Sequence, residues 1–315
     1  MTVPTSPAIT TAGLRKAYGD HVVLAGIDLE VARGAVFALL GPNGAGKTTT
    51  VHILSTLIRS DGGRAQVWGH DVAHDPDAVR AVIGVTGQFS AVDNLLTGRE
   101  NLRLMTDLRH LGKVGGRRRV AELLERFELV DVADQPLVTY SGGMRRRLDL
   151  AMTLVGSPRV IFLDEPTAGL DPRSRLTMWE IIRDLVARGV TIFLTTQHLE
   201  EADELAHRIA VLDGGRLVAE GTADELKRLV PGGHIRLQFV DTDVLAAAAR
   251  ALGGGSRDDN ALTLQLPSDG SVGSLRGLLA RLDEESVEVA GLSIHTPDLD
   301  DVFFALTGRT EEVPS

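Results

Sequence analysis

The sequence predicts an α/β fold whose sheet is mostly parallel, followed by a second, smaller α/β unit. In the first region, short apolar runs alternate with longer amphipathic stretches, as strands and helices do in parallel sheets. A glycine-rich loop directly follows one of these runs. From His234 onward the alternation continues on a smaller scale, in a region with 6 basic and 14 acidic residues. The change in charge and in motifs marks the second unit.

The composition is that of an ordinary globular protein, with 43% hydrophobic and 24% charged residues among 315. This length predicts roughly two domains. The absence of cysteine excludes disulfide frameworks, thiolate metal sites and cysteine nucleophiles, and favours an intracellular protein. A net charge of −10 has the wrong sign for a protein whose whole surface holds a nucleic acid backbone, although a local basic groove stays open. With no secretory signal and no apolar run of about 18 residues, we expect a chain that does not itself cross a membrane.

The first region contains three apolar runs without charges, which we predict to be buried strands, at 36–40, 160–163 and 190–194. Between the first two runs, residues 99–129 are rich in leucine and charge at helical spacing. Glycines predict breaks in this helical stretch at Gly112 and at Gly115-Gly116. We interpret the stretch as part of a helical insertion that covers about 89–155.

A turn and linker signal, Pro231-Gly232-Gly233, separates the two regions. It predicts a first domain over 1–231, an accessory domain over 232–308 and a disordered tail over 309–315. Within the accessory domain, the apolar pattern predicts three strands and three helices in alternation. The strands are 235–240, 262–266 and 287–294, and the helices are 244–252, 275–282 and 299–306.

The loop after the 36–40 strand matches the phosphate-binding pattern G-x-x-x-x-G-K-[ST]. Its residues are Gly41, Pro42, Asn43, Gly44, Ala45, Gly46, Lys47 and Thr48, and a helix is predicted to follow over Thr49 to Ile58. Backbone N–H groups of such a loop wrap phosphates, which predicts that Lys47 reaches the outer phosphates and that the Thr48 hydroxyl binds Mg²⁺. The alternative is an ordinary glycine-rich turn.

The 160–163 strand is followed by two adjacent carboxylates, Asp164 and Glu165. They stand at the carboxyl end of a predicted parallel strand, where ligands of such sheets bind. In P-loop NTPases an Asp at this position helps to hold Mg²⁺, and a neighbouring polar residue orients the attacking water. Asp164 is therefore our metal-binding candidate and Glu165 our general base, although two surface carboxylates that end a strand are the alternative.

The segment Tyr140-Ser141-Gly142-Gly143-Met144 stands directly before a helical run. Free N–H groups at a helix start favour an anion, but an ordinary serine cap explains the pattern equally well. The run Arg145-Arg146-Arg147 that follows adds positive potential near a phosphate or forms a solvated helix face.

His70 and His74 lie four residues apart among acidic residues, and we expect both in an exposed loop.

Taken in order, these motifs resemble those of the ATP-binding cassette, or ABC, ATPases, a P-loop NTPase family. The resemblance covers about residues 9–230 and its motifs are Tyr18-Gly19, the loop 41–48, Gln88, Tyr140 to Met144, Asp164-Glu165-Pro166-Thr167, Ala168-Gly169-Leu170-Asp171 and Thr196-Gln197-His198. The Gly169-Leu170-Asp171-Pro172 run and the segment 296–303 further resemble the drug-resistance branch, typified by daunorubicin and doxorubicin exporter ATPases. The family signature is Leu-Ser-Gly-Gly-Gln, and Tyr140 and Met144 stand here at its outer positions.

The resemblance implies roles for further residues of the site. Tyr18 would stack on adenine, Gln88 would contact Mg²⁺ and the attacking water, and His198 would contact the γ-phosphate. Thr49 and Asp171 would also belong to the nucleotide site, with Asp171 acting across a dimer interface. Ser141, Gly142 and Gly143 would close on ATP that is held by another cassette.

The resemblance also implies how the protein works. ATP and Mg²⁺ would bind between two cassettes, either two copies of this chain or this chain and a related one. A separate transmembrane permease would dock in the groove between the helical insertion and the Gln88 loop, so the chain would be cytoplasmic and peripheral on the inner face of the membrane. The cargo would be a drug-like or hydrophobic compound, with a lipid, peptide or glycan as alternatives. Two other functions stay open: a soluble ABC ATPase of DNA repair or translation, and a nucleotide switch without turnover.

Overall fold

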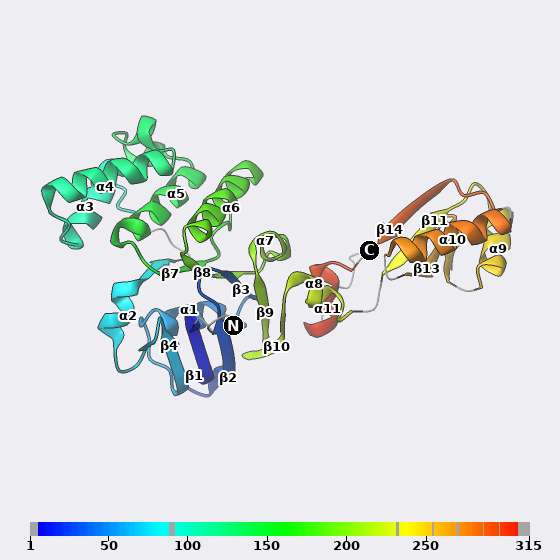
Figure 1. The fold of residues 1–315 in the computed structure, drawn as a ribbon, viewed down its shortest axis with the longest axis horizontal. Helices are drawn as coiled ribbons and strands as arrows, with labels where there is room; N and C mark the ends of the chain where they lie inside the picture. The colour runs from blue at the N-terminus through cyan, green and yellow to red at the C-terminus, as the bar shows by residue number, and fades with distance from the viewer. Residues whose placement is uncertain are drawn as a thin grey trace, which may run out of the picture. The chain divides into compact units, whose positions relative to one another are not determined.

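A computed structural model describes residues 6–87, 92–230, 233–253, 255–268, 271–285, 287–295 and 297–307 (Figure 1). The chain forms two compact units, Met1–Ala223 and Asp224–Ser315. The division falls at the start of helix α8 (Ala223–Lys227), upstream of the Pro-Gly-Gly segment. The predicted tail 309–315 lies outside the described residues.

The first unit is built on a six-stranded, mostly parallel sheet, which confirms the predicted fold class. β3 and β8 are parallel neighbours, as are β7 and β8, so these three strands end at the same edge of the sheet. The antiparallel strand is β10, which pairs with β9. In spatial order the strands are β10 (Arg216–Gly221), β9 (Arg208–Asp213), β3 (Val36–Leu40), β8 (Thr191–Thr196), β7 (Val160–Asp164) and β6 (Ile83–Thr86).

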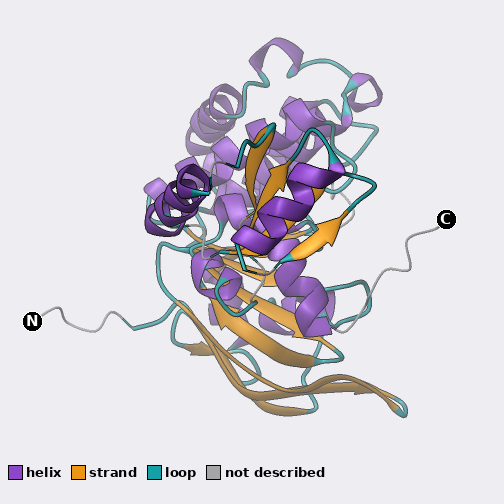
Figure 2. Ribbon diagram, turned by 90° about the vertical axis from the view of Figure 1, so that its right-hand side faces the viewer, coloured by secondary structure: helices purple, strands orange, loops and turns teal. Residues whose placement is uncertain are grey.

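A second, antiparallel sheet belongs to the same unit, and the sequence analysis did not predict it. Figure 2 shows its long strands at the base of the unit. Residues from both sheets and from helix α1 (Lys47–Leu54) form one continuous hydrophobic core. The strands are β2 (His21–Val31), β1 (Ile9–Tyr18), β4 (Gly62–Val67) and β5 (His70–Asp71).

Helix α1 ends at Leu54, and the predicted extension to Ile58 is wrong. Thr56 adopts a left-handed backbone conformation with φ of 64°, which an α-helix does not allow. The N–H groups of Leu57 and Ile58 both donate to the carbonyl of His52, so they turn back over the last helical turn.

The helical insertion contains three main helices on one side of the parallel sheet (Figure 1). The predicted break at Gly112 is confirmed, but the one at Gly115-Gly116 is wrong because a helix runs through both glycines. Gly116 lets this helix approach its neighbour closely, since a Cβ there would lie 2.9 Å from Oγ1 of Thr106. The helices are α3 (Gly98–Leu108), α4 (Gly112–Arg126) and α5 (Gly142–Thr153). No helix of the described residues is long and apolar enough to span a bilayer.

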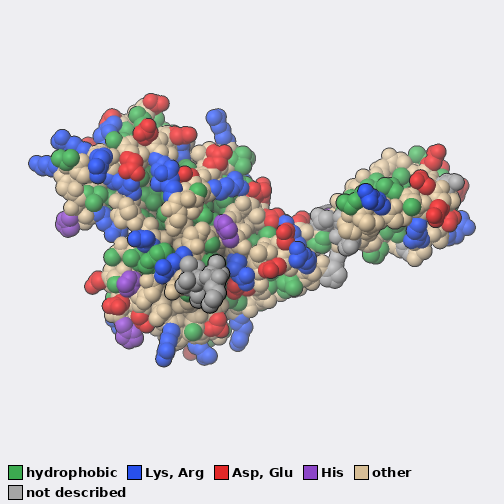
Figure 3. All heavy atoms as spheres, in the orientation of Figure 1, with side chains coloured by type: hydrophobic (Ala, Val, Ile, Leu, Met, Phe, Trp, Pro, Cys, Tyr) green, Lys and Arg blue, Asp and Glu red, His purple; other side chains and the backbone are tan. Residues whose placement is uncertain are grey.

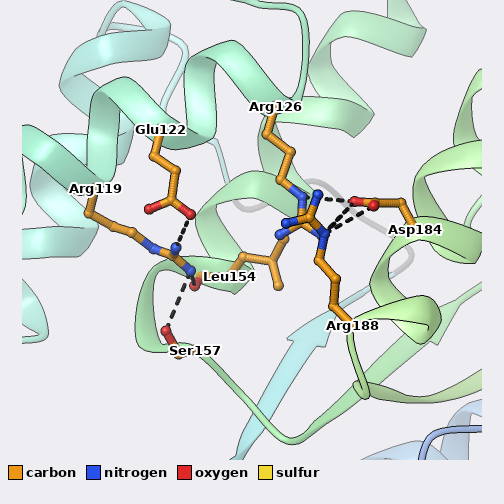
Figure 4. A network of polar contacts seen from close by, with 7 residues as sticks. All are labelled: Arg119, Glu122, Arg126, Leu154, Ser157, Asp184 and Arg188. Atoms are coloured by element: carbon orange, nitrogen blue, oxygen red, sulfur yellow. Dashed lines mark hydrogen bonds and ion pairs between the residues drawn. The ribbon is translucent and has the colours of Figure 1, made fainter.

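Polar contacts connect the insertion to the rest of the first unit (Figure 4). Arg126 of α4 and Arg188 both bind Asp184 of helix α6 (Pro172–Ala187), at 2.8 and 3.0 Å. Arg119, also on α4, donates to the carbonyl of Leu154 at 2.6 Å within the insertion and to Oγ of Ser157, just beyond it, at 3.5 Å. The remaining helices of the unit are α2 (Pro76–Val82) and α7 (Leu199–Leu205).

The second unit has a four-stranded sheet in the order β12-β13-β11-β14, and every neighbouring pair is antiparallel. All six predicted elements are present, but the third strand begins later than predicted, at Gly291. Val287 and Val289 pack against the core of this unit instead of pairing in the sheet. The elements are β11 (His234–Gln238), α9 (Thr242–Ala251), β12 (Ser256–Asp258), β13 (Thr263–Pro267), α10 (Val272–Glu284), β14 (Gly291–His295) and α11 (Leu299–Thr307).

Candidate active site

The glycine-rich loop lies between the end of β3 and the start of α1, as its pattern requires. Two positions of the loop require glycine, because neighbouring residues lie very close to the loop backbone there. A Cβ at Gly41 would lie 2.3 Å from the carbonyl oxygen of Leu212, and one at Gly46 would lie 2.7 Å from Cδ2 of Leu24. Gly46 also has φ of 111°, a conformation that other residues rarely adopt. The loop therefore presents its backbone at the N-terminus of α1, the arrangement that binds phosphates.

Lys47 is the first residue of α1, and its side chain folds back across the loop. The ammonium donates to the carbonyls of Gly41 at 2.7 Å and Pro42 at 3.1 Å. Burial lowers the pKa of Lys47, while the carboxylates of Glu165 and Asp164 oppose that shift. With 5% of the side chain exposed, this cation faces a polar hollow instead of bulk water.

Asp164 and Glu165 are placed by the end of β7, beside β8. Asp164 is 2% exposed and accepts a hydrogen bond from the hydroxyl of Thr195, its neighbour across the two parallel strands. Glu165 has φ of 49°, and its N–H donates to the carbonyl of Thr195 at 3.1 Å. Its carboxylate lies 3.8 Å from Nζ of Lys47. Left-handed backbone in a residue other than glycine is uncommon, and such strain clusters at functional sites.

The loop and Glu165 share one hollow of about 390 Å³. Two side chains fit a Mg²⁺–nucleotide complex here: Thr48 lines the hollow with a hydroxyl from the first turn of α1, and Asp164, which is not part of the lining, ends β7 directly before Glu165. Mg²⁺ in such sites takes one or two protein oxygens and completes its shell with phosphates and water. Among the described residues, no group of three or more His, Cys, Asp or Glu side chains is placed to hold a metal ion. The hollow is lined by His21, Val23, Asn43, Gly44, Gly46, Lys47, Thr48, Thr49 and Glu165.

Tyr18 and His198, two residues that we expect to contact the nucleotide, lie at the rim of the hollow or outside it. Tyr18, at the end of β1, is 53% exposed and pairs in register with His21, which lines the hollow. His198 precedes α7, is exposed, and donates its N–H to Oγ1 of Thr196 at 2.9 Å. Gln88 lies outside the described residues.

The signature segment is not part of this hollow. Ser141 caps α5 by accepting from the N–H of Met144 at 3.2 Å, and Gly142 and Gly143 begin the helix. A Cβ at Gly143 would lie 2.4 Å from Oγ of Ser174 on α6.

Asp171 is likewise a helix cap and does not line the hollow. It caps α6, and its hydrogen bonds from the Ser174 hydroxyl and N–H lower the pKa of the Asp171 carboxyl. The structure therefore brings together the phosphate loop and Glu165, with Asp164 beside them, and leaves the signature segment and Asp171 on a separate surface.

Tyr140 explains one departure from the family signature. Its hydroxyl donates to the carbonyl of Val132 at 2.6 Å, and the side chain is 5% exposed. A Cβ at Gly98 would lie 2.4 Å from this hydroxyl, so a glycine is required opposite the larger side chain. Tyr140 thus holds the segment before α5 against the rest of the helical insertion.

Three polar residues near the site were not assigned from the sequence. Thr195 orients Asp164, as described. Glu201 of α7 is 1% exposed and accepts from the Thr167 hydroxyl at 2.8 Å, and burial raises the pKa of this carboxyl. Arg146 is also buried, at 9% exposure, so a solvated face is wrong for this member of the arginine run. Helical spacing could have indicated that Arg146 is buried. It lies four residues before the buried Leu150 on α5, and residues four apart share one face of a helix.

Comparisons with known proteins agree with this geometry. The family model for ABC transporters matches residues 24–168. A daunorubicin resistance ATP-binding protein of Streptomyces coeruleorubidus is 50% identical over 308 residues, which are 97% of this chain and 98% of that protein. The daunorubicin/doxorubicin resistance ATP-binding protein of Streptomyces peucetius is 49% identical, covering 96% and 93%. A Nod factor export ATP-binding protein of Ralstonia nicotianae is 37% identical, covering 98% and 96%.

Solved structures show the same fold. An ATP-binding subunit of an ABC transporter is 28% identical, with a TM-score of 0.63 over 70% of this chain and 92% of that one. A dimeric ATP-binding cassette in a post-hydrolysis state, bound to ADP and inorganic phosphate, is 25% identical, with a TM-score of 0.62 over 68% and 98%.

Proposed function

The chain belongs to the ABC transporter ATPases, and from this premise we propose that it powers the export of a drug-like or hydrophobic compound through a separate membrane protein. The observation that supports the motor role best is the single hollow shared by the phosphate loop, Lys47 and Glu165. The full-length similarity to two drug-resistance ATP-binding proteins supports the cargo class.

The nucleotide would occupy the hollow with its phosphates on the loop. Backbone N–H groups of residues 43–48 and the Lys47 ammonium would hold the phosphate oxygens, and the exposed ring of Tyr18 would stack on adenine. Thr48 and Asp164 would bind Mg²⁺, which neutralises phosphate charge when present. Because Thr195 donates to Asp164, the orientation of that carboxylate is set before nucleotide arrives.

Hydrolysis would use Glu165 as the general base toward water. Its backbone aims the carboxylate at the hollow, and Lys47 beside it would stabilise the charge that develops on the phosphoryl group. His198 would contact the γ-phosphate from the turn before α7. Gln88 would contact Mg²⁺ and the attacking water, as its family position implies.

A complete site would require a second cassette. Ser141 to Gly143 and Asp171 do not line the hollow of their own chain, so they are available to a nucleotide held by a partner. The dimeric cassette with bound ADP and phosphate shows that such pairs form in a protein of this fold. We propose a second copy of this chain, or a related cassette, in a head-to-tail arrangement with two nucleotides.

The membrane subunit would dock on the helical insertion. Several apolar side chains there are exposed, including Leu95 at 94% and Val114 at 85%, and exposed apolar groups mark interaction surfaces. Figure 3 shows many Lys and Arg side chains on the face of the insertion that is turned toward the viewer. Such docking would hold the chain on the inner face of the membrane.

We further propose residues 1–231 as the nucleotide-binding domain, with the insertion over about 89–155, and 232–308 as a regulatory or partner-binding domain.

A transport assay tests this function. The chain and the membrane protein encoded beside it would be expressed in a drug-sensitive bacterium, and accumulation of daunorubicin measured by its fluorescence. We expect lower accumulation with the pair than with either protein alone, and no reduction when the chain carries Glu165→Gln. Equal accumulation in all strains, with both proteins present in the membrane fraction, would contradict the drug assignment.

A further inference from the structure

Arg146 connects the signature helix to the backbone around Glu165. The residue lies on α5, and its guanidinium donates to three successive carbonyls at the end of β7: Asp164 at 3.0 Å, Glu165 at 3.2 Å and Pro166 at 3.0 Å. The remaining nitrogen, Nη1, donates to the carbonyl of Gly87 at 2.7 Å. All three guanidinium nitrogens are therefore used, and only a planar fork can reach acceptors on opposite sides in this way.

The charge of Arg146 is buried and matched. Burial lowers the pKa of its guanidinium, and the carboxylates of Asp149, Asp164 and Glu201 oppose the shift. Asp149 lies 3.5 Å away on the same helix. Leaving the buried guanidinium or any of its acceptors unpaired would cost free energy. This cost favours the one side-chain geometry in which all of these groups are paired.

The contacts surround Glu165, whose backbone is strained. Glu165 has φ of 49°. Such a strained backbone conformation is retained only where contacts from the surrounding structure hold it in place. Its N–H is bound by Thr195 and its carbonyl by Arg146, which also binds the carbonyls before and after it. The Glu165 carbonyl also accepts from the N–H of Ala168 at 3.2 Å, so Arg146 holds it from the insertion side while the following turn holds it from within the chain.

We propose that Arg146 is a positioning residue for ATP hydrolysis, which fixes the backbone of Glu165 so that its carboxylate faces Lys47 and the hollow. This inference rests on the proposed role of Glu165 as the base. Arg146 also joins the helix that begins after Ser141 to Gly87, the residue before Gln88, so three motifs of the site share one side chain.

The test compares Arg146→Lys with Arg119→Lys in the full chain, alone and with the membrane protein encoded beside it. Arg119 is a matched control, because it also donates to a backbone carbonyl from the insertion but contacts neither β7 nor Gly87. Lysine keeps the charge but cannot reach acceptors on opposite sides of the guanidinium. For Arg146→Lys we expect kcat to fall about tenfold or more, while KM for ATP and the binding of a fluorescent ATP analogue stay within about twofold. For the control we expect both parameters to stay within about twofold.

A double-mutant cycle separates positioning from general loosening of the fold. Single-turnover hydrolysis is measured for Arg146→Lys, Glu165→Gln and the double variant. If Arg146 acts through Glu165, it lowers the rate much less in the Glu165→Gln background than in the wild type. Equal losses in both backgrounds, nucleotide affinity falling in step with kcat, or wild-type turnover by Arg146→Lys would each overturn the inference. Wild-type turnover by Glu165→Gln alone would instead refute the proposed base, and this inference with it.

Discussion

Nζ of Lys47 lies 3.8 Å from the nearer carboxylate oxygen of Glu165, although the two residues follow different strands of the sheet. The parallel pairing of β3 and β7 with β8 puts both strand ends at one edge, and the left-handed turn at Glu165 directs its side chain toward the loop. The cation that we propose for the phosphates and the carboxylate that we propose as the base are thereby adjacent.

Replacing Lys47 by methionine should abolish tight nucleotide binding. The variant loses a charged donor to the phosphates, which is worth about tenfold to a hundredfold in affinity. Titration with a fluorescent ATP analogue measures the change. Lys113→Met, on the exposed face of α4, is the control and should bind as the wild type does. Equal affinity of the Lys47 and Lys113 variants would show that the ammonium does not contact the nucleotide.

Thr195→Val should weaken hydrolysis by releasing Asp164. The buried carboxylate would lose the hydroxyl that orients it, at a cost of about 1 to 3 kcal/mol in the free energy of unfolding. We expect a higher Mg²⁺ concentration for half-maximal ATPase activity, measured by phosphate release. Thr195→Ser keeps the hydroxyl and should restore both stability and the Mg²⁺ requirement. A serine variant as impaired as the valine variant would assign the effect to the lost methyl group.

The two loop glycines Gly44 and Gly46 should differ in their tolerance of alanine. Both have positive φ, but a Cβ at Gly44 meets no atom within 4 Å, whereas one at Gly46 would lie 2.7 Å from Leu24. Gly44→Ala should cost about 1 kcal/mol from backbone strain alone, and Gly46→Ala about 2 kcal/mol more from overlap with the core. Urea unfolding of the two variants measures the difference. Equal costs would mean that the loop moves freely away from β2.

Glu201 should make stability depend on pH. Burial raises its pKa in the folded state, so the folded protein binds this proton more tightly than the unfolded chain. Its contribution to stability is present below the unfolded pKa of about 4.5 and is lost as pH rises through the raised folded value. Relative to Glu201→Gln, the wild type should therefore lose stability as the pH rises above about 4.5, as measured by urea unfolding. A difference that does not change with pH would contradict the burial of a titrating carboxyl.

The chemistry-bearing motifs were predictable because their residues act through local geometry. A strand, a glycine-rich loop and a lysine at the helix start must form nearly the same arrangement wherever they occur, and the structure places Gly41 to Lys47 accordingly. The parallel sheet followed from charge-free apolar runs. The antiparallel sheet of β1, β2, β4 and β5 was missed because irregular pairing in β1 interrupts the alternation of buried and exposed residues.

Arg146 shows what the sequence could not settle. Three successive arginines are explained equally well by positive potential near a phosphate and by a solvated face, and only the tertiary structure brings the carbonyls of β7 and Gly87 to the middle one. The unbroken α4 has a similar cause, because contact of Gly116 with Thr106 outweighs the low helix propensity of glycine. In both cases long-range packing decided the outcome.

ATP hydrolysis by Glu165→Gln, compared with the wild type, tests the central claim most directly. Both are assayed alone and with the membrane protein encoded beside the chain, and bound nucleotide and dimer content are measured in parallel. Loss of a general base predicts turnover lower by about a hundredfold or more, with ATP retained in a dimer. Turnover equal to the wild type would contradict the role of Glu165 and the mechanism built on it.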